Sequence, residues 1–158
     1  MSNEKYARHR GVKIGRNCQI STRNWPTEAY LITIGNNVQI TRNVYFHTHG
    51  GAHVGRYKYP EFDIFGKIVV EDDAYIGTNS QIMPGVTIGK GSLVAAGAIV
   101  SKSIPPHEVW GGIPARRICS VDEYIENNIK YNLNTKSLSP DEKRKYLLSL
   151  DDDNFLKK

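Results

Sequence analysis

The stretch that decides the fold runs from Val70 to Val100 and reads VEDDAYIGTNSQIMPGVTIGKGSLVAAGAIV. An aliphatic residue recurs at every sixth position: Val70, Ile76, Ile82, Ile88, Val94 and Val100. A second, compact residue follows four positions after each of the first five: Ala74, Ser80, Val86, Ser92 and Ala98. A six-residue period fits neither an amphipathic helix nor a half-buried strand. It predicts a parallel β-helix, in which three such hexads make one triangular coil.

The same period extends toward the N-terminus, with two interruptions. Hexads begin at Ile14, break across residues 21–30, and resume between Ile34 and Phe46. The second break covers residues 47–66 and is rich in histidine and aromatic residues. A loop of this length inside a domain is uncommon unless it has a function. We therefore expect an all-β solenoid with a protruding loop over residues 47–66.

The end of the repeat is marked by proline. The coils are predicted to stop at residues 104–106, Ile-Pro-Pro, because proline cannot donate a hydrogen bond to a strand ladder. Two capping boxes follow, Ser120 with Glu123 and Ser139 with Glu142, and each predicts the start of a short α-helix. The sequence thus predicts a β-helical domain over residues 1–118 and a C-terminal helical appendage over residues 119–158.

Composition excludes several classes of protein. The net charge is +5, but the basic residues are scattered and no groove-reading motif accompanies them, so we expect no nucleic-acid partner. The excess charge belongs either to a solvated surface or to a site for a phosphorylated ligand. Two cysteines far apart imply neither a disulfide framework nor a zinc ribbon. The polar N-terminus and the lack of a long apolar run predict a cytoplasmic protein that does not enter a membrane.

Several segments between Gly35 and Ile118 resemble the hexapeptide-repeat acyltransferases. They read NVYFHTHGG, DIFG, YIGTNS, MPGVTIG, AAGAIVSKSIPP and GGIPAR, and they occur in the family's order. Within that family the chain is most similar to the O-acetyltransferases of capsule and lipopolysaccharide O-antigen sugars, relatives of galactoside and maltose acetyltransferases. The most specific segment is GGIPAR, because it comes directly after the last coil.

The resemblance implies a fold, a donor and an assembly. Coils in this family wind left-handed, so the expected fold is a left-handed parallel β-helix. Members are typically homotrimers, with acetyl-CoA as co-substrate in the cleft between neighbouring subunits and no metal required. The implied activity is acetyl transfer from acetyl-CoA to a hydroxyl of a sugar or polysaccharide precursor.

The resemblance also selects one of five histidines as the general base. The family pattern Phe-x-Thr-His-Asp-Gly-Gly matches Phe46, Thr48, His49 and Gly51, so His49 takes the base position, while Gly50 stands where aspartate is common. An imidazole with an ordinary pKa near ~6.5 can take the proton of a hydroxyl at neutral pH and return it to the leaving thiolate. The other histidines are expected to be surface, loop or interface residues: His9, His47, His53 and His107.

A set of donor-binding residues is implied in the same way. The backbone of the Gly77–Thr78 turn is expected to stabilise the oxyanion. The pantetheine arm would pass near Thr78 and Ala96, and Tyr75 would wall the cleft or simply pack there. Cations suit the phosphates of CoA. The expected cofactor-binding residues are Tyr75, Gly77, Thr78, Ala96, Ser101, Lys102 and Arg116.

The long loop is the expected acceptor site. Its aromatic side chains can stack on a sugar ring, and Glu61 or Asp63 can bond its hydroxyls or orient His49. An alternative is that the loop packs into the trimer interface. The candidate substrate-binding residues are Tyr57, Tyr59, Phe62 and Asp63.

Three other functions remain open at this point. The acceptor can be the amine of an amino sugar or of a nucleotide-linked amino sugar. A trimeric zinc protein of the γ-carbonic anhydrase type needs histidines on consecutive coils, but Asn79, Gln81 and Met83 supply no imidazole there. A non-catalytic scaffold would need neither the His49 motif nor the pair Lys102 and Arg116.

Overall fold

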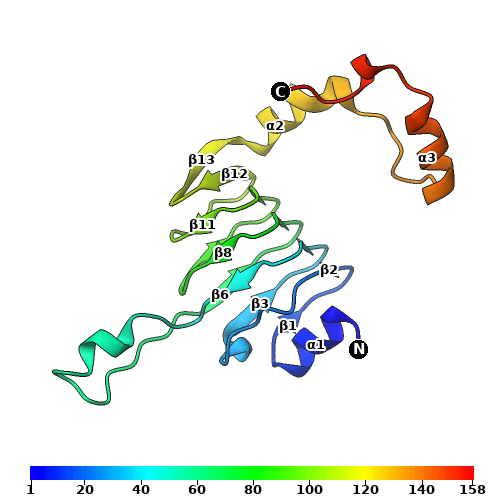
Figure 1. Cartoon of the computed structure of the whole chain (residues 1–158). Coiled ribbons are helices and arrows are strands. Elements are labelled where there is room, and N and C mark those ends of the chain that lie inside the picture. Colours follow the sequence, from blue (N-terminus) through cyan, green and yellow to red (C-terminus); the bar gives the residue numbers. More distant parts are fainter. The chain divides into compact units, whose positions relative to one another are not determined.

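Short strands stack into three sheets that the chain visits in turn (Figure 1). The computed structural model describes all 158 residues. Sheet A has the strand order β1-β3-β6-β9, sheet B the order β13-β12-β10-β7-β4-β2, and sheet C the order β11-β8-β5. The strands are β1 (Lys13–Ile14), β2 (Gln19–Ile20), β3 (Ile32–Ile34), β4 (Gln39–Ile40), β5 (Tyr45–Phe46), β6 (Ile68–Val70), β7 (Tyr75–Ile76), β8 (Gln81–Ile82), β9 (Thr87–Ile88), β10 (Leu93–Val94), β11 (Ile99–Val100), β12 (Glu108–Gly112) and β13 (Ala115–Ser120).

The sequence period appears directly in the pairing of the strands. In sheet A, Val70 lies beside Ile88, and in sheet B, Ile76 lies beside Val94, each pair in parallel register and 18 residues apart. The pairs of sheet C between β8 and β11 keep the same spacing. Three hexads therefore make one circuit of the three sheets. The prediction of a strand-rich chain with short helices is confirmed.

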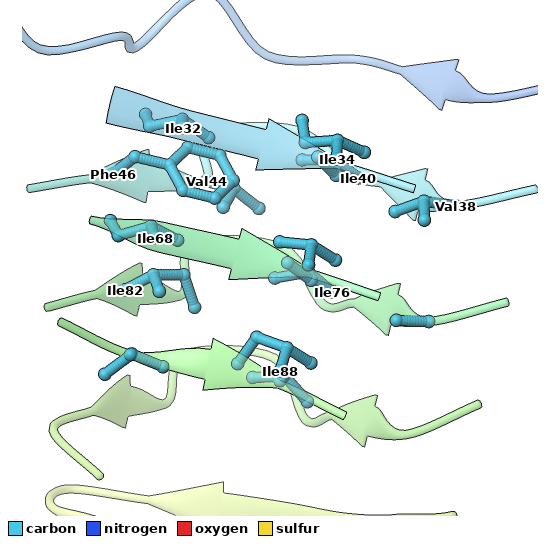
Figure 2. Close-up of a cluster of buried hydrophobic side chains, with 14 of the residues drawn as sticks. Ile32, Ile34, Val38, Ile40, Val44, Phe46, Ile68, Ile76, Ile82 and Ile88 are labelled. Atoms are coloured by element: carbon cyan, nitrogen blue, oxygen red, sulfur yellow. The ribbon is translucent and has the colours of Figure 1, made fainter. Parts of the chain in front are cut away.

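The aliphatic residues of the hexads form the core. Figure 2 shows these side chains stacked above one another between the strands. Side chains such as Ile40, Ile76 and Ile82 have no exposed surface, and full burial of one such side chain contributes about 1.5–3 kcal/mol. The compact positions are buried as well, and their hydroxyls have partners: Ser80 donates to the Ala95 carbonyl at 3.0 Å. Each coil therefore adds the aliphatic and compact residues of its hexads to the core.

The turns between sheets have a period of their own. Asp73, Asn79, Gly85, Gly91 and Gly97 all adopt positive φ, and they are spaced six residues apart. Asparagine, aspartate and glycine tolerate this left-handed conformation better than other residues. Each turn thus carries the residue type that lets the chain bend toward the next sheet.

The end of the ladder differs from the prediction. Pro105 and Pro106 do not stop the strands, because they occupy a turn and the strand β12 follows at Glu108. β12 pairs in parallel with β10, and it then forms an antiparallel hairpin with β13. The missing proline N–H groups fall outside the strand pairings, so they cost the ladder nothing.

The chain divides into two units, Met1–Val121 and Asp122–Lys158. The first unit opens with helix α1 (Asn3–His9) and contains all three sheets. The second unit has no buried residue. Its helix α3 has the predicted capping box, because Ser139 Oγ accepts from Glu142 N–H and the Glu142 carboxylate accepts from Ser139 N–H. The helical segments of both units beyond α1 are η1 (Ala29–Leu31), η2 (Ala52–Gly55), α2 (Val121–Asn128), η3 (Ile129–Tyr131), α3 (Pro140–Leu148) and η4 (Asp152–Asn154).

Two insertions interrupt the coils of the first unit. The segment between β2 and β3 is pinned by Trp25, whose ring stacks on Phe46 with centroids 4.9 Å apart. Thr22 is buried there and donates to the Val44 carbonyl at 2.8 Å. The longer segment between β5 and β6 includes η2 and projects from the sheets as an arm (Figure 1). Both insertions meet at the end of β5, which places their residues beside each other.

Candidate active site

His49 lies at the base of the long loop, where the two legs of the loop are joined. His49 and Phe65 form an antiparallel β-bridge, and the N–H of Gly66 donates to the carbonyl of Thr48 at 2.8 Å. Thr48 is buried, whereas 47% of the His49 side chain is exposed. The backbone around the imidazole is therefore fixed while the ring stays accessible.

Glu28, from the first insertion, holds the imidazole. Its Oε2 lies 2.7 Å from His49 Nδ1 and accepts a hydrogen bond from Thr48 Oγ1 at 3.0 Å. Only 17% of the Glu28 side chain is exposed. Partial burial alone raises the pKa of Glu28, but the hydrogen bonds from His49 and Thr48 outweigh it and bring the pKa below its ordinary value. The carboxylate is thus ionised at neutral pH.

The ionised state of Glu28 determines which ring nitrogen of His49 can act as a base. An ionised carboxylate only accepts hydrogen bonds, so the proton of a neutral imidazole sits on Nδ1. Nε2 is then left with its lone pair, free to take a proton from a substrate. The pair therefore has the geometry of a general base and its orienting group.

Glu28 was missed by the sequence prediction, and the two acidic residues named instead do not contact His49. The Asp63 carboxylate lies 3.8 Å from Arg56, within the arm, and Glu61 is exposed there. The hypothesis that Glu61 or Asp63 orients His49 is wrong. Residues 21–30 have no hexads, so the periodicity contained no signal for Glu28.

The remaining histidines of the cluster have other surroundings. His47 Nε2 lies 3.0 Å from Gln81 Oε1, and its ring stacks on Tyr45 with centroids 6.4 Å apart. His53 is exposed in η2, away from the bridge that fixes His49. Neither has the carboxylate partner that distinguishes His49.

The residues predicted to bind acetyl-CoA lie on two different edges of the coil. We call the turns that lead from sheet B to sheet C the B/C edge. Gly77, Thr78 and Ala96 lie on this edge, in turns after β7 and β10. The turns are tightly stacked, because a Cβ on Gly77 would lie 2.5 Å from Ala96 N. Thr78 Oγ1 donates to Thr41 Oγ1 of the preceding coil at 3.2 Å.

Two further donor-binding candidates extend this group. Arg116 pairs with Gly111 in the β12–β13 hairpin, and a Cβ on Gly111 would lie 2.9 Å from Ala95 Cβ. The hairpin therefore rests on the B/C edge. The Arg116 guanidinium donates only to its neighbour's carbonyl, that of Ala115, at 2.9 Å. Tyr75 lies on the outer face of sheet B and is 37% exposed.

Ser101, Lys102 and His49 lie on the opposite edge of sheet C. We call the turns that lead from sheet C to sheet A the C/A edge; the long loop and the turn after β11 belong to it. The turn at Thr78 and Asn79, the strand β8 and the turn that begins at Pro84 follow one another between the two edges, so sheet C lies between them. One copy of the chain thus keeps His49 apart from the Gly77–Thr78 turn.

The candidate acceptor residues lie further along the arm. Tyr57 and Tyr59 are exposed, and Lys58 lies over the Tyr59 ring at 5.5 Å. Phe62 packs inside the arm, because a Cβ on Gly55 would lie 2.5 Å from its ring. Asp63 is the partner of Arg56. The structure gathers these residues on the arm and not around His49.

Comparison with known proteins identifies the class. The family model described as bacterial transferase hexapeptide (six repeats) matches residues 67–102. Protein CapG of Staphylococcus aureus is 42% identical over 151 residues, which cover 92% of this chain and 87% of CapG. The chain belongs to the hexapeptide-repeat acyltransferase family, and it is an acyltransferase.

Two further relatives are similar to this chain. Galactoside O-acetyltransferase of Escherichia coli strain K12 is 37% identical over 71% of this chain, which spans 55% of that protein. The crystal structure of a hexapeptide-repeat acetyltransferase from Vibrio cholerae, in complex with acetyl coenzyme A, superposes with a TM-score of 0.55 at 30% identity. That match covers 74% of this chain and 76% of the other.

Two further observations concern metal binding and membrane-spanning helices. No group of three or more histidine, cysteine, aspartate or glutamate side chains is arranged to hold a metal ion. No helix combines the length and the apolar character needed to cross a membrane.

Proposed function

We propose that this chain transfers the acetyl group of acetyl-CoA directly to a hydroxyl of a sugar or polysaccharide precursor. The observation that carries the proposal is the pair Glu28–His49, with a 2.7 Å contact at Nδ1 and an accessible imidazole at the loop base. The donor follows from the family and from the acetyl-CoA complex of the Vibrio cholerae relative. The acceptor class is supported by the likeness to galactoside O-acetyltransferase.

The reaction needs one base and one oxyanion donor. His49 Nε2 takes the proton of the acceptor hydroxyl as its oxygen attacks the thioester carbonyl. Glu28 holds the Nδ1 proton and stabilises the imidazolium that forms. When the tetrahedral intermediate collapses, the carbon–sulfur bond breaks, and His49 returns the proton to the CoA thiolate. A general base in this position typically contributes about 10²–10⁴-fold to the rate.

In this proposal, the hydrogen-bond donor that stabilises the oxyanion is the backbone N–H of Thr78. In the Gly77–Thr78 turn the Gly77 N–H already donates to the Val94 carbonyl at 2.8 Å. The Thr78 N–H is the donor that this turn can still offer to a developing negative charge.

The separation of the two edges supports a site shared between copies. His49, Ser101 and Lys102 on the C/A edge of one subunit face Thr78, Ala96 and Arg116 on the B/C edge of the next. The pantetheine arm lies between the edges, and the cations Lys102 and Arg116 meet the phosphates of CoA. The homotrimer that the family implies corresponds to three such contacts closing a ring. Tyr75 walls the cleft from sheet B.

The arm adds contacts to the acceptor. Tyr57, Tyr59 and Phe62 supply aromatic surface, and Asp63 supplies a carboxylate for sugar hydroxyls. The proposal includes the finer features implied by the family: left-handed coils, a catalytic domain over residues 1–118 with the helical appendage 119–158, and a cytoplasmic location. Transfer to an amine of an amino sugar is the second candidate function.

A single assay tests the proposal. Thiol release from acetyl-CoA is followed with a panel of sugars, and acetylated product is detected by mass spectrometry. The variant His49→Ala is expected to lose at least a hundredfold in kcat. His9→Ala, an exposed histidine in α1, is the matched control and is expected to behave as wild type. Turnover that survives His49→Ala would remove His49 from the mechanism.

A further inference from the structure

A small cavity of about 200 Å³ opens directly beside His49. Gly50 follows His49 in the chain, and the Phe65 ring meets the imidazole edge-on, with centroids 6.1 Å apart and planes at 67°. The opposite wall comes from the turn after β8. The cavity is lined by Gly50, Ile64, Phe65, Gly66, Pro84 and Gly85.

The walls limit the size of what can enter. A Cβ on Gly66 would lie 2.3 Å from Gly85 N, so the two walls touch at the inner end. At Gly50 and at Gly85 no atom lies within 4 Å of the position a Cβ would take, so the space above both is open. The volume is smaller than the roughly 300–1,000 Å³ of sites for drug-sized ligands, so it suits a single ring.

The lining of the cavity is also unfavourable for a charged ligand. None of its six residues has a charged or hydrogen-bonding side chain, and half of the Phe65 side chain is exposed. Two carboxylates belong to the surroundings, and both have partners: Glu28 is bonded to His49 and Thr48, and Asp63, which precedes Ile64, lies 3.8 Å from Arg56. A protonated amine would lose its hydration here without gaining an ionic partner, which is unfavourable. An uncharged ring with one apolar face gains contact with Phe65 instead.

We propose that this cavity is the acceptor subsite: it receives one neutral sugar ring, whose C–H face packs on Phe65 while a hydroxyl reaches His49 Nε2. The inference rests on the proposed function and narrows it. It assigns Phe65 and Gly50 as specificity-determining residues. It also favours a hydroxyl acceptor over an ammonium-bearing amino sugar.

Binding to the full chain tests the subsite without requiring turnover. Neutral methyl pyranosides and the corresponding 2-amino-2-deoxy sugars are titrated and followed by saturation-transfer NMR at pH 7. Neutral glycosides are expected to bind at least tenfold more tightly than the amino sugars. Phe65→Leu is expected to weaken that binding about tenfold, as loss of an aromatic contact does. Phe155→Leu, a similarly exposed phenylalanine in the second unit, is the matched control.

A second variant probes the open space. The φ of Gly50 is not left-handed, and no atom lies within 4 Å of the position that a Cβ would take, so Gly50→Ala narrows the cavity without straining the fold. It is expected to raise KM for ring-substituted acceptors more than for the smallest ones, with KM for acetyl-CoA unchanged. Acceptor binding that is insensitive to both variants, or stronger for amino sugars, would overturn the subsite.

The subsite and the proposed function fail in different ways. Phe65-dependent sugar binding without any acetylated product would overturn the proposed function alone. Normal acetyl transfer that is indifferent to Phe65→Leu and Gly50→Ala would overturn the subsite alone.

Discussion

At the scale of single residues, the site depends on the contact of Glu28 with His49. The carboxylate bonds Nδ1 at 2.7 Å and Thr48 Oγ1 at 3.0 Å, so it fixes both the ring and the strand end that carries it. His49 is half exposed, and without Glu28 its ring could rotate and exchange tautomers. In the proposed mechanism, Glu28 is therefore a positioning residue that acts through His49.

Glu28→Gln tests this role. The amide keeps the size of the side chain but loses the negative charge that stabilises the imidazolium. We expect kcat to fall roughly 10- to 100-fold with little change in KM for acetyl-CoA, because second partners of functional histidines have effects of this size. Glu28→Asp, which keeps the charge, is expected to recover part of the loss. Steady-state kinetics at saturating acceptor measure both, and an unchanged kcat for Glu28→Gln would refute the role.

Stability should depend on the same group at acidic pH. The pKa of Glu28 is lowered in the folded chain, so the unfolded state binds the proton more readily. The stabilising contribution is complete above the ordinary carboxyl value of 4.5 and is lost as pH falls through the lower folded value. The Tm difference between wild type and Glu28→Gln is therefore expected to shrink as the pH falls below 4.5. A difference that grows as the pH falls below 4.5 would contradict the sign.

At the scale of elements, the stacked turns of the B/C edge leave no room for side chains at some positions. A Cβ on Gly77 would lie 2.5 Å from Ala96 N and 2.7 Å from the Val94 carbonyl oxygen, and both are backbone atoms that cannot turn aside. The spacing of the turn after β7 is thus set by glycine. The same turn contains the proposed oxyanion donor, so packing and chemistry meet there.

Gly77→Ala is expected to destabilise the fold by about 1–3 kcal/mol, the usual cost of an added methyl group in a tight contact. Chemical denaturation measures the change. Gly50→Ala, which adds the same methyl group in open space, is the matched control and should leave the free energy of unfolding unchanged. Equal stability of the two variants would show that the turns can separate freely.

The elements were predictable from sequence to different degrees. Residues such as Ile82 and Val94 repeat every six positions, so the strands and the core followed from the period. The prediction that Pro105 and Pro106 end the coils was wrong, because both lie in the turn before β12, where no strand hydrogen bond needs their N–H groups. Glu28 and Phe65 lie outside the hexads, and only the folded chain brings them to His49. The period predicts the parts that each coil repeats, whereas Glu28, His49 and Phe65 come from the insertions that interrupt it.

At the scale of the whole molecule, the proposed site draws its residues from both edges of sheet C. His49 lies on the C/A edge, whereas Thr78 and Ala96 lie on the B/C edge, and sheet C lies between them. In the proposed assembly, a complete site takes one edge from each of two copies. Each copy would then contribute to two sites, with its C/A edge in one and its B/C edge in the other.

Subunit mixing tests this arrangement. His49→Ala removes the base, and Ala96→Arg blocks the proposed donor track at an exposed position. Each variant alone is expected to be inactive. After co-refolding at equal amounts, about a quarter of the sites in a closed ring should combine one intact edge from each variant. Recovered acetyltransferase activity near that fraction is the expected result, and a mixture as inactive as its components would show that each chain carries its own site.

The joined legs of the long loop have a consequence for diversification. Because the His49–Phe65 bridge and the bond from Gly66 to Thr48 close the loop at its root, β5 and β6 meet the same junction whatever lies between. Residues 51–63 can therefore be replaced by another segment without changing this junction. Under the proposed function, replacing these residues would change the surface that meets the acceptor while leaving the Glu28–His49 pair in place.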